Sequence, residues 1–274
     1  MICAWDSFLS VLPPWLRQKV DEAGKQTLQE LRLRINAPPE LNLGERRTWL
    51  KETVSREDLQ FCINTASKYS PWAAGTISRC YLTVGGGHRI GICGETVCKN
   101  GHITGIREVR SLNIRVARDF PGIAHGLHPE ESLLILGAPG WGKTTLLRDL
   151  SRVVAQNCTV AVVDERGELF PDGMAIGKRM DVLTGCPKGE GIETVLKVMG
   201  PDWIAVDEIT SAEDISALVR SSGCGVRLMA TAHAASVGDL QRRPVYSSLL
   251  DLGIFRKVIL LRPDKSFKEE RILQ

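Results

Sequence analysis

Residues 137–145 combine glycines, a lysine and threonines in the order and spacing of a phosphate-binding loop, G-x-x-x-x-G-K-[ST]. An apolar run precedes this segment and a helix-forming run follows it, which are the strand and helix that the motif requires. In that setting, backbone N–H groups and the positive end of the helix dipole bind phosphate. Side chains in place of the glycines would obstruct the phosphates. The predicted nucleotide-binding residues are Gly137, Ala138, Pro139, Gly140, Trp141, Gly142, Lys143, Thr144 and Thr145.

Two side chains of this loop have predicted roles of their own. Lys143 is expected to reach the β- and γ-phosphates, and the Thr144 hydroxyl is expected to ligate Mg²⁺. A second apolar run, residues 203–206, ends in Asp207 and Glu208. Because α/β sheets hold ligands at the carboxyl ends of their strands, Asp207 is expected to bind Mg²⁺ and Glu208 to polarise the attacking water. The alternative is a strand followed by a solvated acidic turn.

Polar side chains also follow two other apolar runs. One run leads into an acidic cluster that contains Asp164 and Glu168, and carboxylates beside a nucleotide act near Mg²⁺ or as a base. The other run leads to His233, at the same predicted edge of the sheet, where it is a candidate sensor of the γ-phosphate. An ordinary charged loop and an ordinary polar histidine are the alternatives. No second basic residue is expected at the strand ends beside Lys143.

The composition is that of an ordinary globular protein. The 274 residues are 43% hydrophobic and 24% charged, which allows two domains with real cores. The net charge of +3 includes no Lys/Arg block, and only 5% of residues are aromatic, so a nucleic-acid groove is not expected. Eight scattered cysteines favour reduced thiols. No apolar run approaches the roughly 18 residues of a membrane span, so we expect a cytoplasmic protein that docks on a membrane through partner proteins.

Residues 1–120 predict a strand-rich α+β domain. Two short helices are expected around Pro13-Pro14, and a third is expected to begin at Ser55, with Asp58 in the capping-box position. Asn100-Gly101 is a hairpin signal between two strand-like runs. Expected strands span 28–35, 80–84, 88–98, 102–109 and 112–118. Pro121-Gly122 marks the expected linker.

Residues 121–274 alternate between strand-like and helix-like runs, which predicts a parallel sheet with helices on both faces. The expected strands are 132–136, 159–164, 203–207, 227–232 and 257–261. The expected helices are 143–156, 190–199, 211–222 and 236–243.

The acidic and histidine segments of this second half resemble those of a known group of motors. Residues 201–209 and 231–233 resemble the Walker B and histidine boxes of hexameric type II/IV secretion and pilus-motor ATPases, and residues 164–169 resemble their acidic box. At position 207 this chain carries Asp, whereas many of these motors carry Gly at the matching position. Asp207 therefore supplies a full carboxylate on the side of the site where Mg²⁺ is expected. The resemblance leaves open whether Glu208 or Glu168 is the general base. It implies a RecA-like P-loop NTPase core, ATP and Mg²⁺ as ligands, and a homo-oligomeric ring, a hexamer.

Three N-terminal segments extend the resemblance to the stage III sporulation protein AA family over nearly the whole chain: residues 30–34, 86–91 and 107–118. This resemblance implies a motor that acts in the mother cell during endospore formation and drives membrane proteins of a sporulation channel complex. Similarity to secretion motors also implies that Arg89 and Arg115 reach the nucleotide as the two domains close. A solvated strand face is the alternative for both arginines.

Two other functions remain open at this point. A nucleotide-dependent nucleic-acid-binding module is one alternative, since many related P-loop folds translocate nucleic acid. A small-molecule P-loop kinase is the other, and it would need an acceptor-binding lid that the sequence does not reveal. Stimulation of ATP hydrolysis by membranes or by DNA would separate the motor from the nucleic-acid module.

Overall fold

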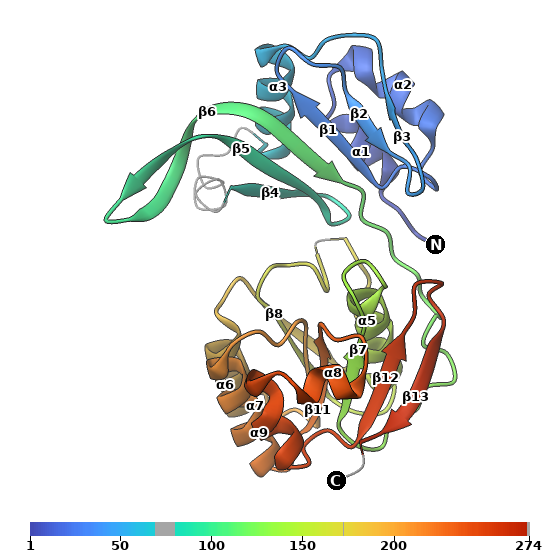
Figure 1. The fold of residues 1–274 in the computed structure, drawn as a ribbon, viewed down its shortest axis with the longest axis vertical. Helices are drawn as coiled ribbons and strands as arrows, with labels where there is room; N and C mark the ends of the chain where they lie inside the picture. The colour runs from blue at the N-terminus through green and yellow to red at the C-terminus, as the bar shows by residue number, and fades with distance from the viewer. Residues whose placement is uncertain (69–79, 172, 273–274) are drawn as a thin grey trace. The chain divides into compact units, whose positions relative to one another are not determined.

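The computed structural model describes residues 1–68, 80–171 and 173–272, and the chain divides into two compact units (Figure 1). Unit 1 comprises residues 1–119 and 171–174, and unit 2 comprises residues 120–170 and 175–274. Each unit has its own β-sheet and its own hydrophobic core. No helix within the described ranges is long and apolar enough to cross a membrane.

Unit 1 combines an antiparallel sheet with helices. Its strands are β1 (Glu30–Arg34), β2 (Glu40–Asn42), β3 (Arg47–Trp49), β4 (Tyr81–Val84), β5 (His88–Lys99) and β6 (His102–Arg115). The helices in its described residues are α1 (Trp5–Ser10), α2 (Pro14–Ala23) and α3 (Arg56–Ala66). The strands lie in the order β3-β2-β1-β6-β5-β4. Helices and strands bury a common apolar cluster, so unit 1 is a strand-rich α+β domain, as expected.

Local sequence signals explain where several elements of unit 1 begin and turn. Pro14 occupies the first turn of α2, where a backbone N–H would have no acceptor within the helix, so the N–H that proline lacks is not missed as a hydrogen-bond donor. Ser55 and Asp58 form a capping box at the start of α3. Asn100 and Gly101 have φ angles of 53° and 78°, the left-handed pair of a two-residue hairpin turn. These three expectations are confirmed.

Two features of this sheet differ from the expectation. Residues 102–109 and 112–118 do not form separate strands, because β6 runs continuously to Arg115. Its register against β5 shifts at several points, and these irregularities interrupt the alternation of apolar side chains. The strands β2 and β3 were not expected, since three residues are too few to display a period of two.

A buried histidine ties the start of the chain to the end of the unit 1 sheet. The side chain of His88 is fully buried; its Nε2 lies 2.9 Å from the carbonyl oxygen of Ala4, and its Nδ1 accepts the N–H of Ala117 at 3.0 Å. Because Nδ1 accepts, the ring proton must lie on Nε2, and the imidazole is neutral. Burial lowers the pKa of His88.

Unit 2 is a mixed α/β domain. Its strands are β7 (Leu133–Leu136), β8 (Val160–Asp164), β9 (Met180–Thr184), β10 (Trp203–Val206), β11 (Arg227–Ala232), β12 (Lys257–Leu261) and β13 (Phe267–Arg271). Its helices are α5 (Lys143–Val154), α6 (Lys188–Met199), α7 (Ala212–Gly223), α8 (Val237–Gln241) and α9 (Pro244–Asp251). The strands lie in the order β13-β12-β7-β11-β10-β8-β9, and every neighbouring pair is parallel except β12 and β13.

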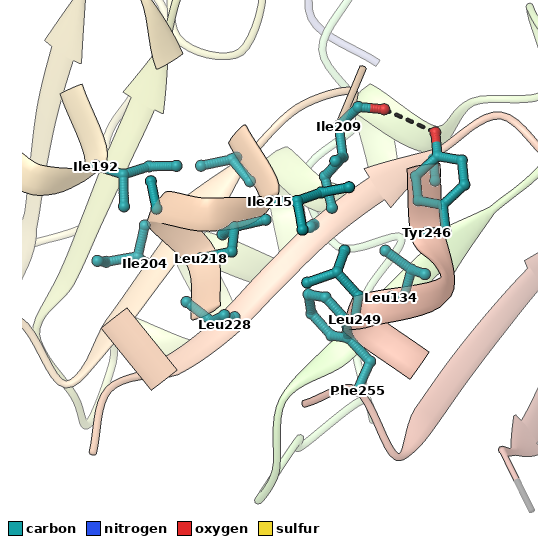
Figure 2. Packing of buried hydrophobic residues seen from close by; sticks show 14 of the residues in the cluster. Leu134, Ile192, Ile204, Ile209, Ile215, Leu218, Leu228, Tyr246, Leu249 and Phe255 are labelled. Atoms are coloured by element: carbon teal, nitrogen blue, oxygen red, sulfur yellow. Dashed lines mark hydrogen bonds between the residues drawn. The ribbon is translucent and has the colours of Figure 1, made fainter. Parts of the chain in front are cut away.

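Helices cover both faces of the unit 2 sheet, as expected. Alternate residues of β7 enter different clusters: Leu134 packs with α6, α7, α8 and α9, whereas Ile135 packs with α5. Figure 2 shows the first cluster, in which the Tyr246 hydroxyl also donates a 2.7 Å hydrogen bond to the carbonyl of Ile209. This bond anchors the segment that follows β10.

The elements of unit 2 that were not expected are β9, β13 and α9. Both strands lie at the edges of the sheet, and their residues are partly exposed, so they lack the continuous apolar runs of the central strands. The remaining strands and helices of unit 2 match the sequence-based prediction within a few residues at each end.

Candidate nucleotide-binding site

Four neighbouring parallel strands end at the same edge of the unit 2 sheet. In the order β7-β11-β10-β8, these strands lead directly into the loops that carry the predicted chemistry. Gly137 follows β7, His233 follows β11, Asp207 follows β10, and Asp164 is the last residue of β8. The sheet therefore brings the glycine-rich loop, both acidic segments and the histidine to one edge.

The glycine-rich loop connects β7 to α5. Gly140 and Gly142 have φ angles of 77° and 101°, in the left-handed region that glycine adopts without strain. Gly142 caps α5 without a side-chain hydrogen bond, and α5 begins at Lys143. The N–H groups at such a helix end, together with its dipole, form an anion-binding site.

Lys143 is folded back onto its own loop. Its buried ammonium donates to the carbonyl oxygens of Gly137 at 2.8 Å and Ala138 at 3.1 Å, and to Nδ1 of His233 at 2.8 Å. Burial lowers the pKa of Lys143, while the carboxylates of Asp207 and Glu208 partly oppose that shift. All three acceptors are neutral, so phosphate oxygens in the loop would be stronger partners for this cation.

Two hydroxyl groups hold the carboxylate of Asp207. Thr144 donates to one of its oxygens at 2.7 Å, and Thr231, at the end of β11, donates to the other at 2.6 Å. The Thr231 oxygen also accepts the backbone N–H of Glu208 at 2.8 Å. Thr231 therefore orients both acidic residues, a role that the sequence analysis missed and that a buried threonine closing an apolar strand could have signalled.

The donor set beside the loop fits Mg²⁺ only together with a ligand. In the described part of the chain, no group of three or more His, Cys, Asp or Glu side chains could hold a metal by itself. A threonine hydroxyl and one carboxylate, Thr144 and Asp207, are in contact. Mg²⁺ is commonly bound by one or two carboxylates plus substrate phosphates, so this pair suits a nucleotide-bound ion.

The imidazole of His233 connects Lys143 to Glu208. Its Nδ1 accepts from the Lys143 ammonium, so the ring proton lies on Nε2 and is directed at a carboxylate oxygen of Glu208 at 2.8 Å. Arg166 lies 3.8 Å from the other oxygen of Glu208. The structure thus brings His233 into direct contact with both Glu208 and the lysine of the loop.

The carboxylate of Asp164 has different partners. One oxygen accepts the N–H of Glu168 at 2.9 Å, and the other accepts those of Leu169 at 2.8 Å and Phe170 at 3.0 Å. Burial raises the pKa of Asp164, and the N–H groups of Phe170 and Leu169 oppose the shift. Asp164 therefore folds the acidic segment around itself. The backbone carbonyl of Glu168 accepts from Arg148 on α5 at 2.8 Å.

The two acidic segments share one hollow at the sheet edge. Its lining consists of acidic, basic and hydroxyl side chains: Asp164, Glu165, Arg166, Glu168, Lys188, Asp207, Glu208 and Thr210. Such a hollow next to the glycine-rich loop can accommodate a water molecule among several proton acceptors.

Arg89 and Arg115 belong to unit 1. They are direct cross-strand partners on β5 and β6, and Arg115 also pairs with Glu30 of β1. Their side chains lie on the face of the sheet opposite to the buried Ile90 and Ile114, and the guanidinium of Arg89 lies 4.2 Å from the centre of the Tyr81 ring. The structure therefore places the two arginines side by side on one face of the unit 1 sheet.

The expectation of no further basic residue at the strand ends is wrong. Lys265, in the turn between β12 and β13, donates to the carbonyl oxygen of Gly140 in the phosphate-binding loop. The sequence analysis missed this contact because β13 was not predicted, and without β13 the residues after β12 carry no sign of a hairpin turn. Lys188, at the start of α6, and Arg166, beside Glu208, are further basic residues at this edge.

Comparison with known proteins agrees with this architecture. The family model described as "Sporulation stage III, protein AA" matches residues 8–271. Stage III sporulation protein AA of Bacillus subtilis is 35% identical over 272 residues, which cover 92% of this chain and 89% of that protein. The expected resemblance over nearly the whole chain is confirmed.

Solved structures of secretion and pilus motors share the fold. The ATPase DotB of Legionella pneumophila superposes with a TM-score of 0.62 at 18% identity, covering 95% of this chain and 80% of DotB. The pilus retraction motor PilT, solved with bound ADP, gives a TM-score of 0.64 at 17% identity, covering 89% of this chain and 77% of PilT. At these identities the likeness shows the fold, a RecA-like α/β core with a strand-rich N-terminal domain. With the family model matching almost every residue, the chain belongs to the sporulation stage III protein AA family.

Proposed function

We propose that this protein binds Mg·ATP at the carboxyl edge of the unit 2 sheet and hydrolyses it as a motor of the secretion-ATPase type. The observation that carries this proposal is the hydrogen bond between Thr144 of the phosphate-binding loop and the strand-end carboxylate of Asp207. It joins the two groups that a P-loop NTPase uses for Mg²⁺. The ADP in the PilT structure supports a nucleotide as the ligand of this fold.

Nucleotide binding would change the partners of Lys143. Its ammonium would leave the loop carbonyls for the β- and γ-phosphate oxygens, which carry charge and accept more strongly. Mg²⁺ held by Thr144 and Asp207 would neutralise charge on the same phosphates. When Lys143 leaves Nδ1, that nitrogen of His233 would face the γ-phosphate, and with a proton on it the imidazole would donate to a phosphate oxygen while Nε2 still contacts Glu208.

Glu208 is the proposed general base. Its carboxylate lies beside Lys143 and His233 in the site, whereas the backbone of Glu168 is part of the turn that Asp164 and Arg148 hold. Glu208 would accept the proton of a water molecule whose oxygen attacks the γ-phosphorus. The bond from that phosphorus to the bridging oxygen then breaks, which yields ADP and phosphate.

The assembly is also part of the proposal. We expect a homo-oligomeric ring, a hexamer as in secretion motors, in the cytoplasm of the mother cell, with membrane proteins of a sporulation channel complex as its partners. Phosphate release and sedimentation of the full chain, each with and without Mg·ATP, test this function. The proposal expects Mg²⁺-dependent phosphate release and a nucleotide-dependent increase in sedimentation. Stimulation by DNA and not by membranes would favour a nucleic-acid translocase, and a chain that neither binds nor hydrolyses ATP would refute the proposal.

Arg89 and Arg115 are proposed to act on the nucleotide of a neighbouring subunit. Their position as a pair of cations on one face of the unit 1 sheet supports this role, since cations at the γ-phosphate accelerate phosphoryl transfer by about 10³-fold or more. Arg115→Ala and Glu208→Gln proteins, each inactive alone, should recover partial activity when mixed. If mixtures that demonstrably co-assemble recover no activity, the arginine acts on the nucleotide of its own subunit or takes no part in the reaction.

A further inference from the structure

Lys188 is a buried lysine that the proposed reaction does not yet use. It is the first residue of α6, and only 6% of its side chain is exposed. Its ammonium donates to the backbone carbonyl oxygen of Glu208 at 2.7 Å. It also lies 3.4 Å from the carboxylate of Asp214 and 3.5 Å from that of Glu165. A buried ammonium is retained where its hydrogen bonds and charge are satisfied, and here one of those bonds goes to the candidate general base.

The backbone at Glu208 needs such support. Its φ angle is 52°, in the left-handed region that side-chain-bearing residues seldom adopt. A backbone in this region persists only where surrounding contacts hold it. The N–H of Glu208 is held by Thr231, and its carbonyl is held by Lys188. On the next residue, Ile209, the carbonyl is held by Tyr246 (Figure 2).

Each of these contacts comes from a different element, and Lys188 supplies the one from α6. The peptide that follows Glu208 is also held through the N–H of Ile209, which donates to the Thr231 carbonyl at 3.0 Å. Without Lys188, the carbonyl of this peptide would lose its donor, and the left-handed turn would lose one of the contacts that hold it. A change of this backbone would change the direction of the Glu208 carboxylate and so its contact with His233, because the backbone determines where the side chain points.

An ion pair that merely joins helices would have a different pattern of contacts. Asp214, the acidic partner on α7, is already held by the N–H groups of Thr210 at 3.1 Å and Ser211 at 3.2 Å in a capping box. Its charge is therefore compensated in part without Lys188. The shortest contact of Lys188 is with the Glu208 carbonyl and not with either carboxylate.

We infer that Lys188 is a positioning residue for hydrolysis, which acts by fixing the backbone of Glu208 and so the direction of its carboxylate. This inference rests on the proposed function. It predicts that loss of the ammonium lowers the rate of hydrolysis and leaves ATP binding intact, because neither Lys143 nor Thr144 depends on Lys188.

The test is Lys188→Met in the full chain, with Lys197→Met as the matched control on the exposed face of the same helix. Turnover in Lys188→Met should fall by about 10- to 100-fold, while ATP affinity stays within about twofold, as expected for a misplaced catalytic group. Lys188→Arg, which keeps a cationic donor, should recover part of the turnover, and Lys197→Met should match the parent. Unchanged turnover in folded Lys188→Met would overturn the inference.

Two further variants distinguish positioning from a structural ion pair, even if Lys188→Met fails to fold. Asp214→Asn removes the charge partner and keeps the shape, so it should retain parental turnover. A large loss of turnover in folded Asp214→Asn would mean that the ion pair is what matters, and it would overturn the inference. In a Glu208→Gln background, Lys188→Met or Lys188→Arg should add no further loss, since the residue acts through Glu208. An additive loss would overturn the inference. Absence of phosphate release in the parent protein would instead refute the proposed function. Because every variant is compared with the parent, failure of the proposed function can be distinguished from failure of the inference about Lys188.

Discussion

Two aspartates end neighbouring strands of the same sheet and have opposite surroundings. Val163 of β8 pairs with Val206 of β10, so Asp164 and Asp207 occupy equivalent positions along the two strands. The oxygens of Asp164 accept backbone N–H groups of its own loop. Those of Asp207 accept hydroxyls from two other elements, the phosphate-binding loop and β11.

This difference shows what a strand-end carboxylate can do at one sheet edge. A carboxylate whose oxygens are occupied by backbone donors folds its loop, and a bound ion would have to displace several hydrogen bonds to reach it. Hydroxyl donors can instead rotate, or become metal ligands themselves, so the carboxylate they hold remains accessible to a cation. Asp164 therefore holds its own loop, and Asp207 is the one that we propose for the Mg²⁺ side of the site.

The largest effect on turnover is expected from a comparison of Glu208, which follows Asp207, with Glu168, in the loop that Asp164 holds. Glu208→Gln should retain bound ATP and lower turnover by about 10²- to 10⁴-fold, because an amide cannot accept the proton of the attacking water. Glu168→Gln is the matched control and should retain most of the turnover. The measurement is phosphate release together with quantification of bound nucleotide. If Glu168→Gln is inactive and Glu208→Gln is not, the general base lies in the β8 segment and the comparison is reversed.

A smaller effect is expected on binding. Lys143→Ala removes the cation that we propose binds the phosphates, and the loss of a charge-assisted contact of about 1.5–3 kcal/mol should weaken ATP binding by about tenfold to more than a hundredfold. Lys197→Ala, on the exposed side of α6, should bind ATP as the parent does. Calorimetric titration of the folded variants measures this difference. Unchanged ATP affinity in Lys143→Ala would contradict the proposal that this loop binds the nucleotide.

Two histidines differ in the same way as the two aspartates: one is bound by backbone groups, and the other lies among side chains of the candidate site. His88 is held by backbone groups within unit 1, whereas His233 lies between Lys143 and Glu208. Burial lowers the pKa of His88 below its usual 6.5, so the unfolded chain takes up the proton more readily than the native one. The contribution of His88 to stability should be complete above pH 6.5 and should be lost as the pH falls through the lower native value.

Urea unfolding at pH 7.5 and at pH 5.5 measures this smallest effect. His88→Phe leaves the N–H of Ala117 without its acceptor, and it should lower the free energy of unfolding by about 1–3 kcal/mol at pH 7.5 while reducing the pH dependence. His102→Phe, at an exposed position of the hairpin, is the control. His233→Ala should instead lower turnover with little change in unfolding. An equal pH dependence in the parent and in His88→Phe would contradict the role given to His88.

Much of this edge could be predicted because its signals are local in the sequence. The phosphate-binding loop is one continuous segment, and Asp207 and Glu208 stand directly after a buried strand. Parallel pairing then necessarily brings such strand ends together. The central strands were predicted for the same reason, since burial on both faces produces continuous apolar runs.

What could not be predicted depends on contacts between distant segments. Lys188 and Lys265 look like ordinary surface lysines in the sequence, and only the packing of α6 and the pairing of β12 with β13 bring them to the site. The aspartates Asp164 and Asp207 are both preceded by apolar strands, so the pattern cannot tell which donors each will meet. The edge strands β9 and β13 are half-exposed and carry too little periodicity to stand out.

Titration of phosphate release with Mg²⁺, in the parent and in Asp207→Asn and Asp164→Asn, tests the assignment of the two aspartates most directly. The account predicts Mg²⁺-dependent release in the parent. In Asp207→Asn, the Mg²⁺ requirement should rise by about tenfold or more, since the loss of a charged ligand removes roughly 1.5–3 kcal/mol. Asp164→Asn should keep the parental Mg²⁺ midpoint and lose about 1–3 kcal/mol of stability, because its amide nitrogen cannot accept the backbone donors of the loop. A shifted Mg²⁺ midpoint in Asp164→Asn, with Asp207→Asn unchanged, would contradict it.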